Sequence, residues 1–259
     1  MIAENLLEIK DLSVDYAGGN KLFGKATPFR ALKNINLALE KGKTLGIVGE
    51  SGCGKSTLAK TIIRLLEPTS GQIIFEGTDI TKLRGASLKN YRRQIAMIFQ
   101  DPADSLNPKM KIEKILAEPL EIHGVKNREG RVRELMGLVG LPEAFLERYP
   151  HELSGGQRQR VGIARALALE PKLVICDEPV SALDLSIQSQ IINLLLTLQN
   201  KLGLSFIFIS HDLRLVRHFS DRIAVLYNGE CVEDGPAETV YRAPQHAYTK
   251  KLLADRMPL

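Results

Sequence analysis

The sequence predicts an α/β protein whose core is a mostly parallel β-sheet covered by helices on both faces. From Lys172 onward, short unbroken apolar segments such as "KLVICDEP" and "SFIFISHD" alternate with amphipathic helical segments. This alternation is typical of parallel strands joined by helices. Nearer the N-terminus, the apolar "TLGIV" is followed by a glycine-rich stretch and then by the helical pattern "STLAKTIIRLL". Both observations predict the same class of fold.

The remaining elements add two further layers to this core. The segments "LLEIKDLSVDY", "LKNINLALE" and "GQIIFEGTDI" alternate short strands with turns and predict a small antiparallel β layer. The segments "KIEKILAEPLEIHG" and "NREGRVRELMGLVG" place apolar residues at helical spacing. We therefore expect one domain over residues 1–259. Its α/β core would comprise residues 1–104 and 166–259, and an inserted helical subdomain residues 105–165.

Composition sets limits on the class of protein. The chain has 259 residues, of which 44% are hydrophobic and 25% charged, as in ordinary folded soluble domains. No apolar run approaches the roughly 18 residues of a spanning helix, and Glu4 and Glu8 stand where a secretory signal is basic. The three cysteines are far apart and predict neither a disulfide framework nor a zinc site. The net charge of +5 comes without a nucleic-acid motif, so no nucleic-acid partner is expected.

The glycine-rich stretch "GESGCGKST" predicts a phosphate-binding loop. It fits the pattern G-x-x-x-x-G-K-[ST] and lies between a strand and a helix, as that motif requires. Gly49 and Gly54 allow the backbone to point several N–H groups at one anion. Lys55 would reach the β- and γ-phosphates, and the hydroxyl of Ser56 would bind Mg²⁺. The motif predicts nucleotide binding without specifying what the protein does with it.

Two adjacent acids follow a buried strand in "LVICDEP". Asp177 is placed to orient Mg²⁺ through water, and Glu178 to align an attacking water or accept its proton. The alternative is that the two carboxylates only cap the following turn. The upstream phosphate loop favours the first interpretation, in which the two carboxylates take part in hydrolysis of the bound nucleotide.

Three further residues are weaker candidates. His211 in "ISHD" would contact the γ-phosphate or hold the water near Glu178, although a lone histidine is more often structural. Gln100 at the end of "MIFQ" would contact Mg²⁺ or water, and a single glutamine is an equally weak sign. Tyr16 would stack on an adenine or lie in the core.

The segment "LSGGQRQRVGIARALALEP" predicts a second phosphate-binding surface. Ser154, Gly155 and Gly156 directly precede an amphipathic helix, whose N-terminal amides form a second anion nest. One ATP does not need two such nests from a single chain. We therefore expect two chains to pack head to tail, each covering the nucleotide of the other.

Taken together, these motifs resemble those of ATP-binding cassette (ABC) ATPases over nearly the whole chain. In family order, "GESGCGKST" matches Walker A, "LSGGQ" the signature, "LVICDEP" Walker B, "SALD" the D-loop and "SHD" the switch histidine. The resemblance implies a RecA-like P-loop NTPase fold. It also implies that the protein hydrolyses ATP and that Mg²⁺ is its cofactor. It implies Gln100, Glu178 and His211 as catalytic residues and Ser56, Gln100 and Asp177 as Mg²⁺ ligands. The nucleotide contacts it implies are Tyr16, Gly49, Ser51, Gly52, Cys53, Gly54, Lys55, Ser56, Thr57, Ser154, Gly155, Gly156, Gln157 and Asp184.

A finer resemblance concerns the transported solute. "FQDPADSLNPKMKI" and "APQHAYTKKLL" resemble the dipeptide, oligopeptide and nickel importer ATPases. No cysteine follows Cys231, and this departure from many oligopeptide members favours a nickel or metallophore subunit. The resemblance implies transmembrane permease subunits, a second ABC ATPase chain and, indirectly, an extracytoplasmic solute-binding protein as partners, with the chain peripheral on the cytoplasmic face of the membrane.

Two functions outside transport are alternatives for a chain with these motifs. DNA-repair and chromosome-structure ATPases of this family split the cassette with a long coiled coil, and no sustained heptads occur here. Translation factors of this family carry two cassettes in one chain, whereas this chain has one phosphate loop and one "LSGGQ".

Overall fold

The computed structural model describes residues 4–16, 29–100 and 105–254, and these divide into two compact units. Unit 1 comprises residues 1–88 and 205–259, and unit 2 comprises residues 89–204. The predicted boundary at residue 104 lies outside the described residues, as does most of the loop that precedes Phe29. The division at residues 105 and 165 stays a prediction.

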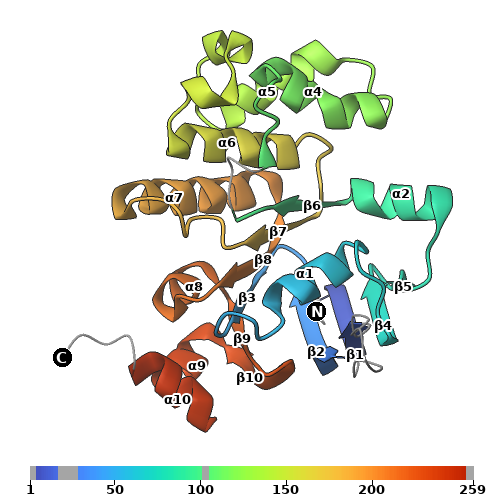
Figure 1. The fold of residues 1–259 in the computed structure, drawn as a ribbon, viewed down its shortest axis with the longest axis vertical. Helices are drawn as coiled ribbons and strands as arrows, with labels where there is room; N and C mark the ends of the chain where they lie inside the picture. Colours follow the sequence, from blue (N-terminus) through green and yellow to red (C-terminus); the bar gives the residue numbers. More distant parts are fainter. Residues whose placement is uncertain (1–3, 17–28, 101–104, 255–259) are drawn as a thin grey trace, which may run out of the picture. The chain divides into compact units, whose positions relative to one another are not determined.

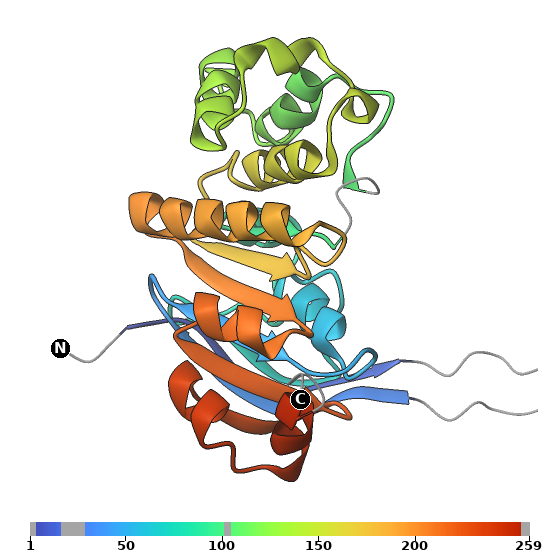
Figure 2. The same ribbon diagram turned by 90° about the vertical axis from the view of Figure 1, so that its left-hand side faces the viewer.

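Unit 1 contains an antiparallel sheet in the order β2-β1-β4-β5. Its strands are β1 (Asn5–Tyr16), β2 (Phe29–Glu40), β4 (Ser70–Phe75) and β5 (Thr78–Asp79). Strands β1 and β2 lie side by side along their length (Figure 2). The expected antiparallel layer is therefore confirmed.

A second set of strands in unit 1 runs mainly parallel. Strand β3 (Thr44–Val48) pairs in parallel with β8 (Ser205–Ser210) and with β9 (Arg222–Tyr227), and β9 pairs antiparallel with β10 (Glu230–Pro236). All five residues of β3 and all six of β8 are buried. Their unbroken apolar sequences are explained by this burial on both faces. "TLGIV" and "SFIFIS" form strands as the sequence predicts.

The helices of unit 1 are α1 (Lys55–Ile62), α8 (Leu213–Phe219), α9 (Ala237–Arg242) and α10 (Ala247–Ala254), and α2 (Gly85–Arg93) contains the boundary between the units (Figure 1). Helix α1 ends before the predicted Leu66, because Arg64 adopts a left-handed conformation with φ of 60°. That conformation is incompatible with a continuing right-handed helix.

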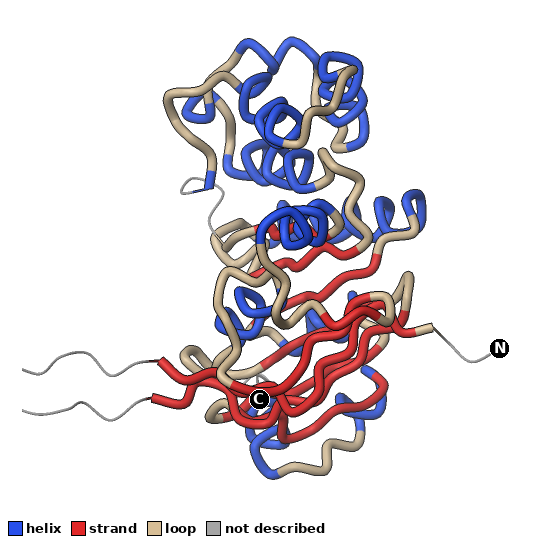
Figure 3. Tube along the Cα trace, turned by 90° about the vertical axis from the view of Figure 1, so that its right-hand side faces the viewer, coloured by secondary structure: helices blue, strands red, loops and turns tan. Residues whose placement is uncertain are grey.

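Unit 2 contains the parallel strands β6 (Ile95–Ile98) and β7 (Leu173–Asp177) with helix α7 (Leu185–Leu202). Its remaining elements are α4 (Ile112–Ile122), α5 (Arg128–Leu138), α6 (Gly155–Ala166) and the short 3₁₀ helices Glu143–Glu147 and Pro150–Glu152. In Figure 3 the stretch from α4 to α6 is drawn entirely as helices and loops. Both predicted helical segments in this stretch are confirmed.

Among the described residues, no helix combines the length and the hydrophobicity that crossing a bilayer requires.

Candidate nucleotide-binding site

The phosphate-binding loop lies between the end of β3 at Val48 and the start of α1 at Lys55. The N-cap residue of α1 is Gly54, which offers no side chain to accept hydrogen bonds from the first helical amides, and the first turn has no acidic residue. The first amides of a helix point along its axis without intrahelical partners and carry partial positive charge. The start of α1 therefore suits an anion.

Two glycines of this loop have no substitute. Gly54 has φ of 111°, and a Cβ there would lie 2.8 Å from the carbonyl oxygen of Ala31. A Cβ on Gly49 would lie 2.2 Å from the carbonyl oxygen of Leu226. Because both obstacles are backbone atoms, neither could move aside cheaply. The loop is held against two other strands of unit 1 at these points.

Lys55 is only 6% exposed. Its Nζ donates hydrogen bonds to the carbonyl oxygens of Gly49, at 2.8 Å, and Glu50, at 2.9 Å. A buried ammonium is costly unless it is hydrogen-bonded and compensated. Because both carbonyl acceptors are neutral, an anionic group is the natural complement of this charge. The residues of the loop thus fit a nucleotide phosphate.

Cys53 lies inside this loop but is 6% exposed. Burial raises the pKa of its thiol, against the opposing effect of Lys55. A protonated, buried thiol is a poor nucleophile. Its role in the loop is therefore that of a small apolar side chain.

Two other predicted residues of unit 1, His211 and Tyr16, lie near the phosphate-binding loop or the helix that follows it. Val48 lies opposite Ser210 in the β3–β8 register, so the phosphate-binding loop and His211 leave adjacent strands at the same level. The carboxyl ends of parallel strands are where such folds bind ligands. His211 is half-buried. The hydroxyl of Tyr16 lies 3.2 Å from Oγ1 of Thr57, which places this half-exposed ring beside α1.

In unit 2, the structure brings Gln100 and Glu178 together. Ile98 of β6 lies opposite Cys176 of β7, so the two residues follow adjacent parallel strands. Nε2 of Gln100 donates to Oε2 of Glu178 at 3.5 Å, at the long end for a hydrogen bond. Asp177 ends β7 and is 8% exposed.

Glu178 also has an uncommon backbone conformation, with φ of 49°. Positive φ in a residue other than glycine costs free energy, so the surrounding structure must hold it. Its carbonyl oxygen accepts hydrogen bonds from the backbone N–H and the hydroxyl of Ser181. These bonds hold the turn that leads to the "SALD" segment.

The "LSGGQ" segment forms the start of α6 as a capping box. Oγ of Ser154 accepts from the N–H of Gln157 at 3.3 Å, and Oε1 of Gln157 accepts from the N–H of Ser154 at 3.0 Å. This reciprocal pair gives both side chains a structural role in starting the helix. A Cβ on Gly156 would lie 2.7 Å from Cγ2 of Ile187, so α7 packs close against the signature segment.

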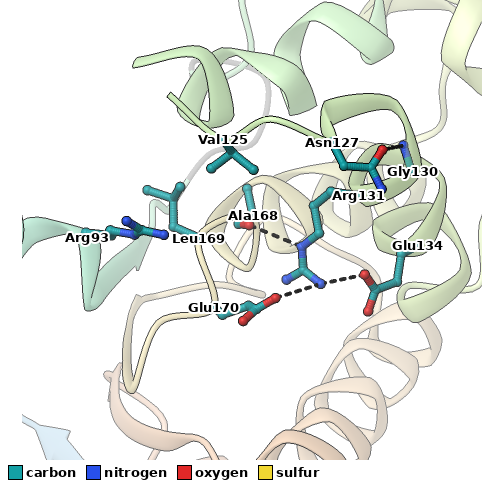
Figure 4. A pocket seen from close by; sticks show the side chains of 9 residues that line it. All are labelled: Arg93, Val125, Asn127, Gly130, Arg131, Glu134, Ala168, Leu169 and Glu170. Carbon is teal, nitrogen blue, oxygen red and sulfur yellow. Dashed lines mark hydrogen bonds and ion pairs between the residues drawn. The ribbon is translucent and has the colours of Figure 1, made fainter. Parts of the chain in front are cut away.

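The other end of α6 is fixed by Arg131 of α5. Its guanidinium donates to the carbonyl oxygens of Leu167, at 2.8 Å, and Ala168, at 3.2 Å, and pairs with Glu134 and Glu170 (Figure 4). The pocket of about 380 Å³ around it is lined in part by these groups, so the charge of Arg131 is already paired. We assign it no ligand.

Asp184 is the N-cap residue of α7, is exposed, and makes no side-chain cap hydrogen bond. The preceding turn is held instead by Gln188, whose Nε2 donates to the carbonyl oxygens of Val180 and Leu183. The next residue, Leu185, is the first of helix α7 and is 81% exposed. Gln188 was not predicted from the sequence, although it lies one helical turn after Asp184.

Comparison with known proteins accounts for this set of motifs. A family model described as "ABC transporter" matches residues 32–181. The oligopeptide transport ATP-binding protein OppF of Streptococcus mutans is 49% identical to the chain, with 97% of the chain and 81% of OppF covered. AppF of Bacillus subtilis, an oligopeptide transport ATP-binding protein, is 50% identical, with 97% and 78% covered. The dipeptide transport ATP-binding protein DppF of Lactococcus lactis is 48% identical, with 97% and 81% covered.

Solved structures agree with the sequence comparison. A dimeric, post-hydrolysis state of the ATP-binding cassette MJ0796 bound to ADP and Pi has a TM-score of 0.78 at 32% identity, with 89% of this chain and 98% of that chain covered. CbiO1 of Clostridium perfringens, part of an ABC transporter complex, has a TM-score of 0.78 at 29% identity, with 98% and 96% covered. The P-loop NTPase fold predicted from the sequence is confirmed. The chain belongs to the ABC transporter family, and it is an ATP-binding ATPase of that family.

Proposed function

We propose that the chain is the ATP-hydrolysing subunit of an importer for short peptides. The observation that carries this proposal is its identity of 49% and 50% to transport proteins named for oligopeptides, over 97% of its length. The relative from Lactococcus lactis is named for dipeptides. Nickel or metal chelates, which one feature of the sequence favours, are a second class of cargo, and the same experiment tests them.

The site supports a division of roles among the chain's own residues. The amides at the start of α1 and the ammonium of Lys55 would hold the β- and γ-phosphates. Ser56, Gln100 and Asp177 would contribute the protein ligands of Mg²⁺, an ion that commonly takes few protein ligands beside substrate phosphates. Bound MgATP supplies a phosphoryl group whose transfer to water drives the cycle.

Hydrolysis requires a group that orients water. Glu178 is proposed for this role, with its carboxylate held by the Gln100 amide. The hydrogen bond from Gln100 would also tie the position of Glu178 to the segment that follows β6. His211, which follows β8 next to β3, would hold the water or the γ-phosphate.

We further propose that the site is completed by a second cassette. The signature segment Ser154–Gln157 would cover the nucleotide bound to the neighbouring chain, and Asp184 would contact that chain. The dimeric state of the ATP-binding cassette MJ0796, a chain that is 32% identical, supports this arrangement. The neighbour would be a second copy or a similar ATPase.

Transmembrane permease subunits and an extracytoplasmic solute-binding protein are the further partners we propose, with the chain peripheral at the cytoplasmic face of the membrane. The two non-transport functions, in DNA repair and in translation, have less support. The longest helix among the described residues is α7, with 18 residues, so the described part of the chain holds no long coiled coil of a repair ATPase.

The proposal is tested by purifying the tagged chain from its own cells in mild detergent. We expect two membrane permeases to co-purify, and ATP hydrolysis by the assembly in proteoliposomes to rise on adding short peptides with the solute-binding protein. Nickel chelates tested in parallel distinguish the second cargo. An assembly without any membrane protein would contradict an importer function.

A further inference from the structure

The C-terminal helix α10 contacts the phosphate-binding loop directly. The hydroxyl oxygen of Tyr248 accepts a hydrogen bond from the backbone N–H of Glu50 at 2.9 Å. These residues are 198 positions apart in the sequence and both belong to unit 1. Tyr248 is only 7% exposed, whereas Glu50 is exposed, so the contact is partly shielded from water.

The peptide group between Gly49 and Glu50 is held on both of its sides. Its carbonyl oxygen accepts from Nζ of Lys55 at 2.8 Å, and its N–H donates to Tyr248. In a planar trans peptide the C=O and N–H point in opposite directions. A rotation of this peptide would therefore break both bonds together, so the hydroxyl of Tyr248 also fixes one of the two carbonyls that hold Lys55.

The position of Tyr248 is itself well determined. Its ring packs at a tilt against that of Tyr227 at the end of β9, with centroids 4.2 Å apart and planes at 31°. The carboxylate of Glu233 in β10 accepts from the backbone N–H groups of Gln245 and His246, at 2.8 and 3.0 Å, just before α10 begins. Residues Tyr248, Thr249, Leu252 and Leu253 form the buried face of the helix.

A second contact joins the same hairpin to the loop. The N–H of Gly229, in the turn between β9 and β10, donates to the carbonyl oxygen of Cys53 at 3.1 Å. The turn has positive φ at both Asn228 and Gly229, as tight hairpin turns with the right-handed strand twist require. The β9–β10 hairpin and α10 thus hold the phosphate-binding loop at two separate peptide groups.

We propose that Tyr248 is a positioning residue of the nucleotide site, and that the segment "HAYT" fixes the Gly49–Glu50 peptide so that Lys55 is already in place when a triphosphate binds. This inference rests on the proposed role of the loop in binding ATP. The ring of Tyr248 supplies packing and its hydroxyl supplies the specific acceptor. Burial raises the pKa of Tyr248, which keeps the hydroxyl protonated at physiological pH.

The test compares Tyr248→Phe with Tyr227→Phe in the full-length chain. Each variant removes one hydroxyl from the same pair of packed rings, but of the two tyrosines only Tyr248 accepts a hydrogen bond from the loop. Hydrogen exchange at the Glu50 amide, followed by mass spectrometry of overlapping peptides without nucleotide, reports the bond itself. Titration with MgATP, under conditions that prevent turnover, measures how much the loss of this hydrogen bond weakens nucleotide binding.

We expect Tyr248→Phe to accelerate exchange at Glu50 and to weaken MgATP binding about two- to tenfold, the range that corresponds to one lost hydrogen bond. Tyr227→Phe should change neither quantity. Wild-type exchange and affinity in Tyr248→Phe would overturn the inference, as would equal effects of both variants, which would indicate only ring packing.

Lys55→Ala separates this inference from the proposed function. If Lys55→Ala loses MgATP binding while Tyr248→Phe retains wild-type affinity, the loop binds the nucleotide and the role of Tyr248 fails. If Lys55→Ala binds MgATP with wild-type affinity, the proposed role of the loop in binding the nucleotide is refuted, whatever the result for Tyr248→Phe.

Discussion

Ser154 and Gln157 each accept a hydrogen bond from the backbone N–H of the other at the start of α6, at 3.3 and 3.0 Å. This reciprocal cap means that the signature serine contributes to folding as well as to the proposed contact with a neighbouring nucleotide. Substituting it with alanine would impair both roles at once. A useful variant must keep the cap and change only the charge.

Ser154→Asp is such a variant. Aspartate caps helices about as well as serine, so the free energy of unfolding should stay close to the wild-type value, whereas Ser154→Ala should lower it by about 1 kcal/mol. The added carboxylate would repel a neighbour's triphosphate and should abolish ATP-dependent pairing and hydrolysis. Denaturant unfolding and ATPase assays check the two effects separately, and normal hydrolysis by Ser154→Asp would argue against the proposed contact.

Gly156→Ala should destabilise unit 2 by about 1–3 kcal/mol, because its Cβ would lie 2.7 Å from Cγ2 of Ile187. Ile187→Ala removes that carbon, so the double variant should be less destabilised than the sum of the single variants. Gly162→Ala in the same helix is the control, because a Cβ there meets nothing within 4 Å, and we expect it to be neutral or stabilising. Denaturant unfolding measures all four proteins, and strict additivity would contradict the contact.

Lys55→Ala should weaken MgATP binding strongly, because it removes the buried ammonium of the phosphate-binding loop. Lys60→Ala provides the matched control, since Lys60 lies on the same helix, carries the same charge and is exposed. Fluorescence titration with a nucleotide analogue compares the two. Similar affinities in both variants would refute the assignment of the loop.

The cysteines should react slowly with maleimides near neutral pH. Burial raises the pKa of the Cys53 thiol and raises that of Cys231 to about 11. Because the thiolate is the reactive form, a raised pKa lowers its fraction at any pH below that pKa. Alkylation of Cys231 should therefore accelerate as pH rises from 8 toward about 11. Peptide mass mapping measures each site, and a fast, pH-independent reaction at Cys53 would contradict its burial.

The sequence predicts the parts of this site that depend on local pattern. "TLGIV" forms β3 over the expected residues because an unbroken apolar run beside a turn has few alternatives. The helix at "LSGGQ" begins at Gly155 because serine is a strong N-cap. Contacts between segments that are far apart in the sequence leave no comparable local pattern from which they could be predicted. The hydrogen bond from Glu50 to Tyr248, the contact of Gly156 with Ile187 and the left-handed conformation of Glu178 all depend on tertiary structure.

The central claim is that Gly49–Thr57 and Ser154–Gln157 are halves of sites that only a second cassette completes. Glu178→Gln keeps the shape of the catalytic residue but removes the carboxylate that would orient water, so it should trap the assembly with MgATP bound. The decisive measurement is the structure of that trapped assembly, purified with its natural partners. We predict the Ser154 hydroxyl within hydrogen-bond distance of the triphosphate on the neighbouring cassette. A nucleotide-loaded assembly with Ser154 facing solvent would contradict the account.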